Sequence, residues 1–212
     1  MIPSRLLQKL ADDPRIPESS RLAFLRTLDM DRVWRSRRSE KRVHEEQVKA
    51  STRILVHDCE GQEILPGVAV DPMMSADATV QRAFRFTKKI AQFYLECLNR
   101  NSIDDAGKDL VSSVHFSQVY SNAYWSPSLM QMVYGDGDGF ILLDFTLSPE
   151  FIAHEVAHGL THFTADLDYV DQAGALNESV SDVLGTMCQS ACKLDPISAS
   201  KIDPPCDVEI RA

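Results

Sequence analysis

The stretch FIAHEVAHGLTHF, residues 151–163, holds three of the six histidines of the chain. It contains the pattern His-Glu-x-x-His, with His154 and His158 four residues apart. Ser148 suits an N-cap and Pro149 the first helical position, so a helix is predicted to begin there. Residues four apart lie one turn apart on one helix face, so the two imidazoles can bind a single Zn²⁺ ion. The alternative is an amphipathic helix with surface histidines, because the motif also occurs by chance.

A catalytic zinc site needs a third protein ligand and an open position for water. The longer pattern HExxHxxGxxH is absent, because Thr161 and Thr164 occupy its Gly and His positions. A carboxylate from a second helix is the other source. Glu178 lies 24 residues after His154, and Asp182 follows four residues later. Like charges four apart destabilise a helix slightly, so a nearby metal ion explains this pair better than an exposed acidic face does. We therefore predict Glu178 as the third ligand.

Two polar residues of the same segment are candidates for orienting the histidines. Ligand histidines usually donate their second ring N–H to a carboxylate or carbonyl oxygen, which fixes the tautomer. Asp182 lies on the helix face of Glu178 and is predicted to accept this bond from one histidine. Asn177 is predicted to do the same for the other.

The rest of the pattern predicts an α+β fold with a mostly antiparallel sheet. Two short helices separated by DDPRIPESS are expected first, then two short strands within RILVHDCEGQEILPGVAV, and a long helix capped by Ser75. A further strand is predicted in LVSSVHFSQVY, and a second late helix from the spacing of apolar residues after residue 174. We divide the chain into a helical leader, a central part and an irregular tail: residues 1–50, 51–190 and 191–212.

Composition and charge narrow the classes of protein to which the chain can belong. A hydrophobic content of 44% over 212 residues is typical of a globular protein with a core, and no apolar run suggests a membrane span. No Sec-type signal peptide is visible, which leaves a cytoplasmic or non-classically secreted location open. Residues 1–53 carry a net charge of +5 and residues 54–212 one of −14. The leader is therefore expected to dock on the acidic remainder or to be cut off at its Arg-rich stretch, rather than to bind nucleic acid. Five cysteines without a C-x-x-C do not indicate a disulfide framework.

Several motifs in order resemble the thermolysin-like peptidases, the M4 metallopeptidases. HEVAHGLT followed by GALNESVSD carries the resemblance, and MVYGDGDG, NAYW, NSID and RILVHDCEGQEILPG extend it over about residues 52–190. The short leader is more similar to that of the protealysin branch than to the long propeptides of secreted thermolysins. The resemblance implies a zincin-type fold, one zinc ion and a peptide or protein substrate.

The resemblance also implies roles for single residues. It implies that Glu155 is the general base and that Tyr169 stabilises the oxyanion of the tetrahedral intermediate. Asn122, Ala123 and Trp125 match the edge segment that holds the substrate backbone by strand-like pairing.

The sequence departs from the family pattern at two places. Family members have a second, mostly helical domain that closes the cleft and supplies a histidine, and no histidine follows His162 here. We expect most of that domain to be absent from this chain, and the surface it would cover to be covered by a dimer or by such a domain. Glu150 matches one acidic calcium ligand of the family but Gln189 replaces another, so a calcium site is possible but degraded.

Three hypotheses follow. The first is a zinc metalloendopeptidase that cleaves near hydrophobic residues and whose leader is a propeptide covering the cleft. The second is a truncated, non-catalytic relative that binds zinc or a partner. The third is a fragment of a full-length peptidase. The intact Glu155 favours the first, because a pure zinc-binding protein has no need of that carboxylate.

Overall fold

The computed structural model describes residues 2–37 and 51–192. The strands are β1 (Ile54–Asp58), β2 (Val68–Val70), β3 (Leu110–Val114), β4 (Ala123–Ser126) and β5 (Gln131–Tyr134). The helices are α1 (Ser4–Asp12), α2 (Glu18–Arg37), α3 (Ala78–Leu98), α4 (Pro149–Thr164) and α5 (Asp171–Ala191), with a 3₁₀ turn at Phe145–Leu147. No helix in the described ranges is both long and apolar enough to cross a membrane. The predicted tail lies outside the described residues, except for its first two positions.

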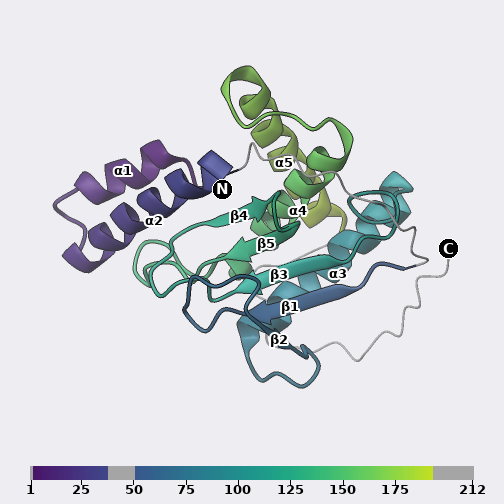
Figure 1. The fold of residues 1–212 in the computed structure, drawn as a ribbon, viewed down its shortest axis with the longest axis horizontal. Coiled ribbons are helices and arrows are strands. Elements are labelled where there is room, and N and C mark those ends of the chain that lie inside the picture. The colour runs from purple at the N-terminus through teal and green to yellow at the C-terminus, as the bar shows by residue number, and fades with distance from the viewer. Residues whose placement is uncertain (1, 38–50, 193–212) are drawn as a thin grey trace.

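The five strands form one mixed sheet in the order β2-β1-β3-β5-β4 (Figure 1). The outer pairs β1–β2 and β4–β5 are antiparallel, while β1–β3 and β3–β5 are parallel. The prediction of a mostly antiparallel sheet was therefore wrong. Parallel neighbours need a long crossover, and the chain supplies one in α3, which lies between β2 and β3 in sequence. The α+β class with helices beside a sheet is confirmed.

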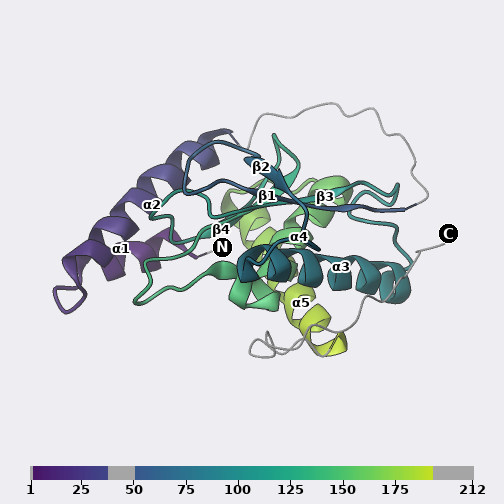
Figure 2. The same cartoon turned by 90° about the horizontal axis from the view of Figure 1, so that it is seen from below.

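Helices α3, α4 and α5 gather on one side of the sheet (Figure 2). The main core lies between them and the strands, and its largest buried side chains include Trp125, Tyr94 and Ile90. Most of helix α4 is buried, including His154 and His158. The motif helix is thus a central element of the fold, and a surface helix with exposed histidines is excluded.

The predicted start of α4 is confirmed and that of α3 is not. Ser148 caps α4 by accepting the backbone N–H of Phe151, and Pro149 is the first helical residue. The cap of α3 is Asp77, whose side chain accepts the N–H of Thr79. Ser75 instead accepts the N–H of Asp77. The cap of α3 lies two residues later than predicted, because the carboxylate that accepts a backbone N–H of the first helical turn is that of Asp77.

The described part of the leader forms two packed helices beside β4 (Figure 1). Helix α2 has 20 residues, so the prediction of two short helices was wrong for the second one. Leu7, Ala11, Ile16 and Phe24 form a small core of their own, against which Leu142 from the central part packs. The leader is therefore joined to the central part by apolar contact as well as by the hydrogen bonds described below.

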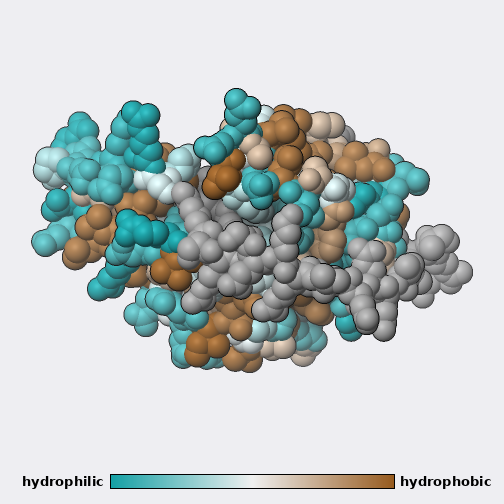
Figure 3. Space-filling model, turned by 45° about the horizontal axis from the view of Figure 1, so that its top comes forward, coloured by the Kyte–Doolittle hydropathy of each residue, from teal (hydrophilic) through white to brown (hydrophobic). Residues whose placement is uncertain are grey.

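Helix α5 is confirmed, but its apolar residues lie largely on its outer side. Leu176, Val183 and Met187 are exposed. The buried positions are instead small or polar: Gly174, Asn177, Ser181, Gly185 and Cys188. Of these, Asn177, Ser181 and Gly185 contact α4. Hydrophobic residues appear among hydrophilic ones on the surface drawn in Figure 3. The packed face of α5 is thus the one that carries its site residues.

Candidate metal centre

Three side chains from α4 and α5 converge at the centre of the helical layer. The Nε2 atoms of His154 and His158 are 3.0 Å apart. A carboxylate oxygen of Glu178 lies 3.4 Å from the Nε2 of His154, and the other lies 3.6 Å from the Nε2 of His158. Both histidines are buried and Glu178 is partly exposed. The structure therefore brings together the three ligands predicted from spacing.

Close packing of α4 on α5 makes this convergence possible. A Cβ atom added to Gly185 would lie 3.1 Å from the backbone oxygen of Glu150 and 3.5 Å from the backbone nitrogen of His154. A larger residue at this position would push α5 away from α4 at the backbone of His154. The glycine thus allows the carboxylate of α5 to reach the histidines of α4.

The Nδ1 atoms of both histidines, which we call the outer nitrogens because they face away from the cluster, are hydrogen-bonded by side chains of α5. The Nδ1 of His154 lies 2.9 Å from Asp182 Oδ1, and the Nδ1 of His158 lies 2.8 Å from Asn177 Oδ1. Asn177 donates its Nδ2 to the backbone oxygen of Leu167, which turns its carbonyl oxygen toward the imidazole. An amide oxygen only accepts hydrogen bonds, so this contact assigns the proton of His158 to Nδ1. Its Nε2 lone pair then points toward His154.

Ser181 is a contact that sequence reasoning missed. Its Oγ lies 3.1 Å from the Nδ1 of His158. The signal was available, because Ser181 follows Asn177 by four residues and so lies on the same face of α5. It adds a second polar neighbour to the outer nitrogen of the buried imidazole.

The donor set fits zinc. Two imidazole lone pairs that face each other at 3.0 Å repel unless a cation lies between them. Donor atoms around a tetrahedral zinc ion are about 3.3 Å apart when each lies about 2.0–2.1 Å from the metal. The observed separations of 3.0, 3.4 and 3.6 Å bracket that value. Two histidines and one carboxylate are also a known ligand set of catalytic zinc.

The charge states of the site suit ligands. Burial lowers the pKa of His158 to about 4, so its imidazole is neutral at pH 7. Burial works to raise the pKa of Glu178, but the contact with His154 and the neighbouring charges outweigh it and bring the pKa to about 2. A neutral imidazole and an ionised carboxylate are the forms that bind a metal.

The structure also places the predicted general base Glu155, the predicted oxyanion residue Tyr169, and His162 relative to this cluster. Glu155 is fully buried on α4 between the two histidines in sequence. Burial would raise the pKa of its carboxyl, but nearby charges, including those of the histidines, lower it. The ring of Tyr169 is 5.7 Å from that of His158. His162 does not join the cluster; its ring nitrogen is 3.6 Å from Asp166.

The predicted substrate segment consists of Asn122 and the first residues of the edge strand β4. Asn122, Ala123 and Trp125 are all buried. The Trp125 ring lies inside the core beside Gly159 of α4. The ligand cluster and β4 are linked through this contact, because β4 packs on the motif helix.

The predicted calcium residues form no metal cluster in the described ranges. Glu150 accepts a hydrogen bond from Thr186 at 2.9 Å. The groups of His, Cys, Asp and Glu side chains that could hold a metal ion among residues 2–37 and 51–192 do not include Glu150. Calcium has no support here.

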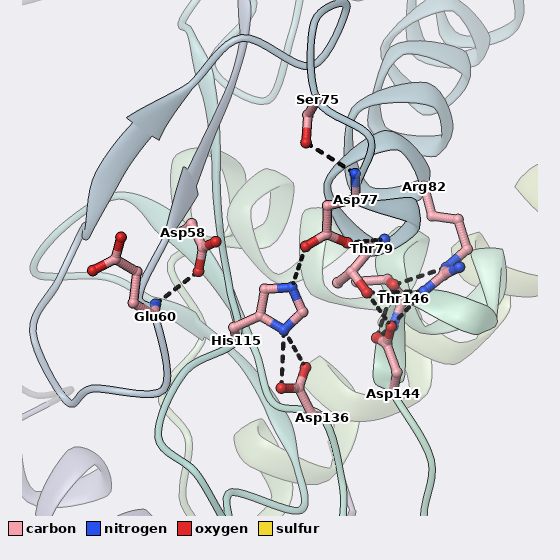
Figure 4. A network of polar contacts seen from close by, with 10 residues as sticks. All are labelled: Asp58, Glu60, Ser75, Asp77, Thr79, Arg82, His115, Asp136, Asp144 and Thr146. Atoms are coloured by element: carbon pink, nitrogen blue, oxygen red, sulfur yellow. Dashed lines mark hydrogen bonds and ion pairs between the residues drawn. The ribbon is translucent and has the colours of Figure 1, made fainter.

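A second acidic and histidine cluster lies at the carboxyl ends of the parallel strands (Figure 4). The Nδ1 of His115 is 2.8 and 2.9 Å from the oxygens of Asp136, and its Nε2 is 2.9 Å from Asp77. Asp58, at the end of β1, is close to the same imidazole. The hydrogen bond to Asp136 raises the pKa of His115 to about 9, with help from Asp77 and against partial burial. The sequence analysis did not find this group.

The order of these elements and the site match a known family. A profile described as "Thermolysin metallopeptidase, catalytic domain" matches residues 25–162. The chain belongs to the thermolysin family of metallopeptidases. A second profile of the family, "Thermolysin metallopeptidase, alpha-helical domain", matches residues 165–201, which include α5. The family implies zinc as the metal for the cluster of His154, His158 and Glu178.

Members of the thermolysin family align with between about two thirds and nine tenths of this chain. Protease PrtS of Photorhabdus sp. is 36% identical over 195 residues, which are 88% of this chain and 52% of that protein. Thermolysin of Bacillus sp. is 34% identical over 148 residues, 68% of this chain and 27% of that protein. The structure of the precursor of protealysin from Serratia proteamaculans matches with a TM-score of 0.75 at 32% identity, covering 91% of this chain and 56% of that one. The chain thus spans about half the length of PrtS and of the protealysin precursor.

Proposed function

We propose that this chain carries the catalytic zinc site of a metalloendopeptidase that hydrolyses peptide bonds near hydrophobic residues. The observation that carries the proposal is the convergence of His154, His158 and Glu178, with both outer ring nitrogens held from α5. A site held in this way from its outer side fixes the orientation of its ligands before substrate arrives. The preference for hydrophobic neighbours is an expectation from the family.

Glu155 is proposed as the general base. It lies next to His154 on α4, and neighbouring charges lower the pKa of its buried carboxyl, which favours the carboxylate form that a general base needs. Zinc, when bound, polarises the scissile carbonyl and lowers the pKa of water. Glu155 would take the proton from the attacking water and pass it to the leaving amine.

Tyr169 and β4 are proposed to hold the substrate. The Tyr169 ring stands beside His158, where its hydroxyl can donate to an oxyanion. Strand β4 lies at the edge of the described sheet, so an extended peptide can add to it as a further strand. Asn122, the residue before β4, is proposed to fix the peptide backbone through its side-chain amide.

The leader is proposed to be a prosegment that covers this cleft and is removed. Ile2 donates its backbone N–H to Asn122 Oδ1 at 2.7 Å. Trp34 packs on Tyr124, with ring centroids 5.4 Å apart. The leader thus contacts the strand that is proposed to bind substrate. The matching structure from Serratia proteamaculans is that of a precursor.

A peptidase assay tests the proposal. The purified chain is given zinc and a quenched peptide with a hydrophobic P1′ residue, before and after trypsin cleaves the Arg-rich stretch of the leader and is inactivated. We expect cleavage that a chelator abolishes. Glu155→Gln should lower turnover on the order of 10²–10⁴-fold, the usual contribution of a general base.

Glu150→Gln is the matched control, because Glu150 is exposed on the same helix and bonds to Thr186. It should retain activity. A zinc-loaded chain that cleaves nothing after leader removal, or a Glu155→Gln variant as active as the parent chain, would contradict the proposed function and favour a non-catalytic zinc protein.

A further inference from the structure

Helix α2 of the leader contacts the central part through polar side chains that are themselves buried. Thr27 is fully buried and Asp31 is 3% exposed, and they lie one helical turn apart on one face. The backbone N–H of Ser121 donates to the Thr27 hydroxyl at 2.9 Å. Polar groups are rarely buried unless they are hydrogen-bonded, so this face of α2 is fitted to a particular partner surface.

That surface is the segment leading into β4. The hydroxyl of Tyr120 donates to Asp31 Oδ1 at 2.6 Å, and the Nδ2 of Asn122 donates to Asp31 Oδ2 at 2.8 Å. Both donors belong to residues that are fully buried. Each carboxylate oxygen of Asp31 therefore takes one hydrogen bond from the central part.

Contacts within the chain use every hydrogen-bond donor and acceptor of the Asn122 side-chain amide. A side-chain amide offers two N–H donors and two acceptor lone pairs. Its oxygen accepts the N–H of Ile2 at 2.7 Å and that of Ala123 at 2.9 Å. Its nitrogen donates to Asp31 at 2.8 Å and to the Ile2 backbone oxygen at 3.4 Å. Three of the four bonds go to the leader, so a peptide substrate has no bond left to make with this amide.

We propose that Asp31 is the anchor by which the leader holds Asn122 away from substrate, so that leader and substrate compete for one side-chain amide. The inference rests on the proposed role of Asn122 in substrate binding. Ile2 makes backbone contacts that any residue could make, whereas Asp31 supplies a side chain. Hydrogen bonds to a charged group are stronger than neutral ones, which makes Asp31 the residue that selects this docking position. Asp31 is a positioning residue and takes no part in the chemistry.

Hydrogen exchange of the full chain, followed by mass spectrometry, tests the anchor without requiring turnover. The variants are Asp31→Asn and Asp31→Ala. The control is Asp29→Asn, because Asp29 is 74% exposed on the same helix and pairs with Arg32. We expect exchange in residues 18–34 and 119–124 to become 10- to 10²-fold faster in both Asp31 variants, the effect of losing one or two charge-assisted bonds. The control should match the parent chain, and α4 and α5 should be unchanged in all three.

Unchanged exchange in residues 18–34 of the Asp31 variants overturns the proposal. If α4 also becomes unprotected in those variants, Tyr120→Phe decides, because it removes one donor to Asp31 from the opposite side. Faster exchange of residues 18–34 in Tyr120→Phe supports the anchor, and unaltered exchange refutes it.

The peptidase assay then separates this inference from the proposed function. A competitor raises the apparent KM and leaves kcat unchanged, so Asp31→Asn should lower KM before trypsin treatment, while Asp29→Asn should not. Hydrogen exchange of the leader can be faster in Asp31→Asn while no variant cleaves peptide; the proposed function then fails and the anchor stands. If cleavage is normal and exchange is unaltered, the anchor fails and the function stands.

Discussion

Two clusters in this molecule surround histidine with acidic groups, and they differ in where the acceptors lie. In the metal centre, Asp182 and Asn177 take the outer Nδ1 atoms of His154 and His158, and the Nε2 atoms face each other. In the second cluster, Asp136 and Asp77 occupy both nitrogens of one imidazole, that of His115.

The difference decides what each cluster can bind. Acceptors on the outer side leave two lone pairs directed at one point, and a cation at that point satisfies them. Acceptors on both sides of one ring leave no lone pair, and the protonated imidazole is itself the cation. The first arrangement is a metal site and the second is an internal ion pair that joins the end of β3 to the loop after β5 and to the start of α3 (Figure 4).

The largest expected effect comes from removing one histidine from each cluster. His158→Ala should lose zinc on gel filtration, because the two remaining ligands are too few for a stable zinc site. His115→Gln should keep about one zinc per chain. Native mass spectrometry and elemental analysis measure the metal content. Zinc retained in His158→Ala, or lost in a folded His115→Gln, would remove the distinction between the two clusters.

A smaller effect is expected from the outer contact of the metal centre. Asp182→Ala leaves all three ligands in place but frees the Nδ1 of His154, and loss of such a contact typically weakens metal binding by about 10- to 100-fold. Competition with a chromophoric chelator measures the affinity. Asp168→Ala, an exposed acidic residue before α5, is the control for lost negative charge. Equal affinities in the two variants would show that Asp182 acts by charge alone.

The metal centre could be predicted from the sequence because its parts are local. His154 and His158 share one helix, Glu178 and Asp182 share another, and helical spacing places each pair on a face. The sheet was mispredicted because short strands show no direction in sequence. The long helix between two of them was the available signal for parallel pairing.

Contacts between distant segments could not be predicted in this way. His115, Asp77 and Asp136 follow or precede different elements, and only the order of the strands brings them together. Asp31 was one acidic residue in a basic leader, so net charge gave no sign that it is the leader residue whose carboxylate takes two bonds from the central part. The docking expected from opposite charges is made, in the described residues, by apolar packing and buried hydrogen bonds.

The smallest expected effect is the pH dependence of stability that the second cluster contributes. The pKa of His115 rises from 6.5 to about 9 on folding. A raised pKa means that the stabilisation is complete below pH 6.5 and is lost as the pH rises through about 9. Partial burial at this site limits the contribution to about 1–2 kcal/mol. His115→Gln should therefore be less stable than the parent chain by that amount at about pH 6, and equally stable at about pH 10. Urea denaturation across this range measures the difference.

His57→Gln is the control. Burial lowers the pKa of His57, so the contribution of His57 to stability is lost in the opposite direction, as the pH falls. The free energy of unfolding of His115→Gln could instead stay below that of the parent chain by the same amount above pH 9. The ring would then stabilise the loop by packing, and the cluster would not be an ion pair.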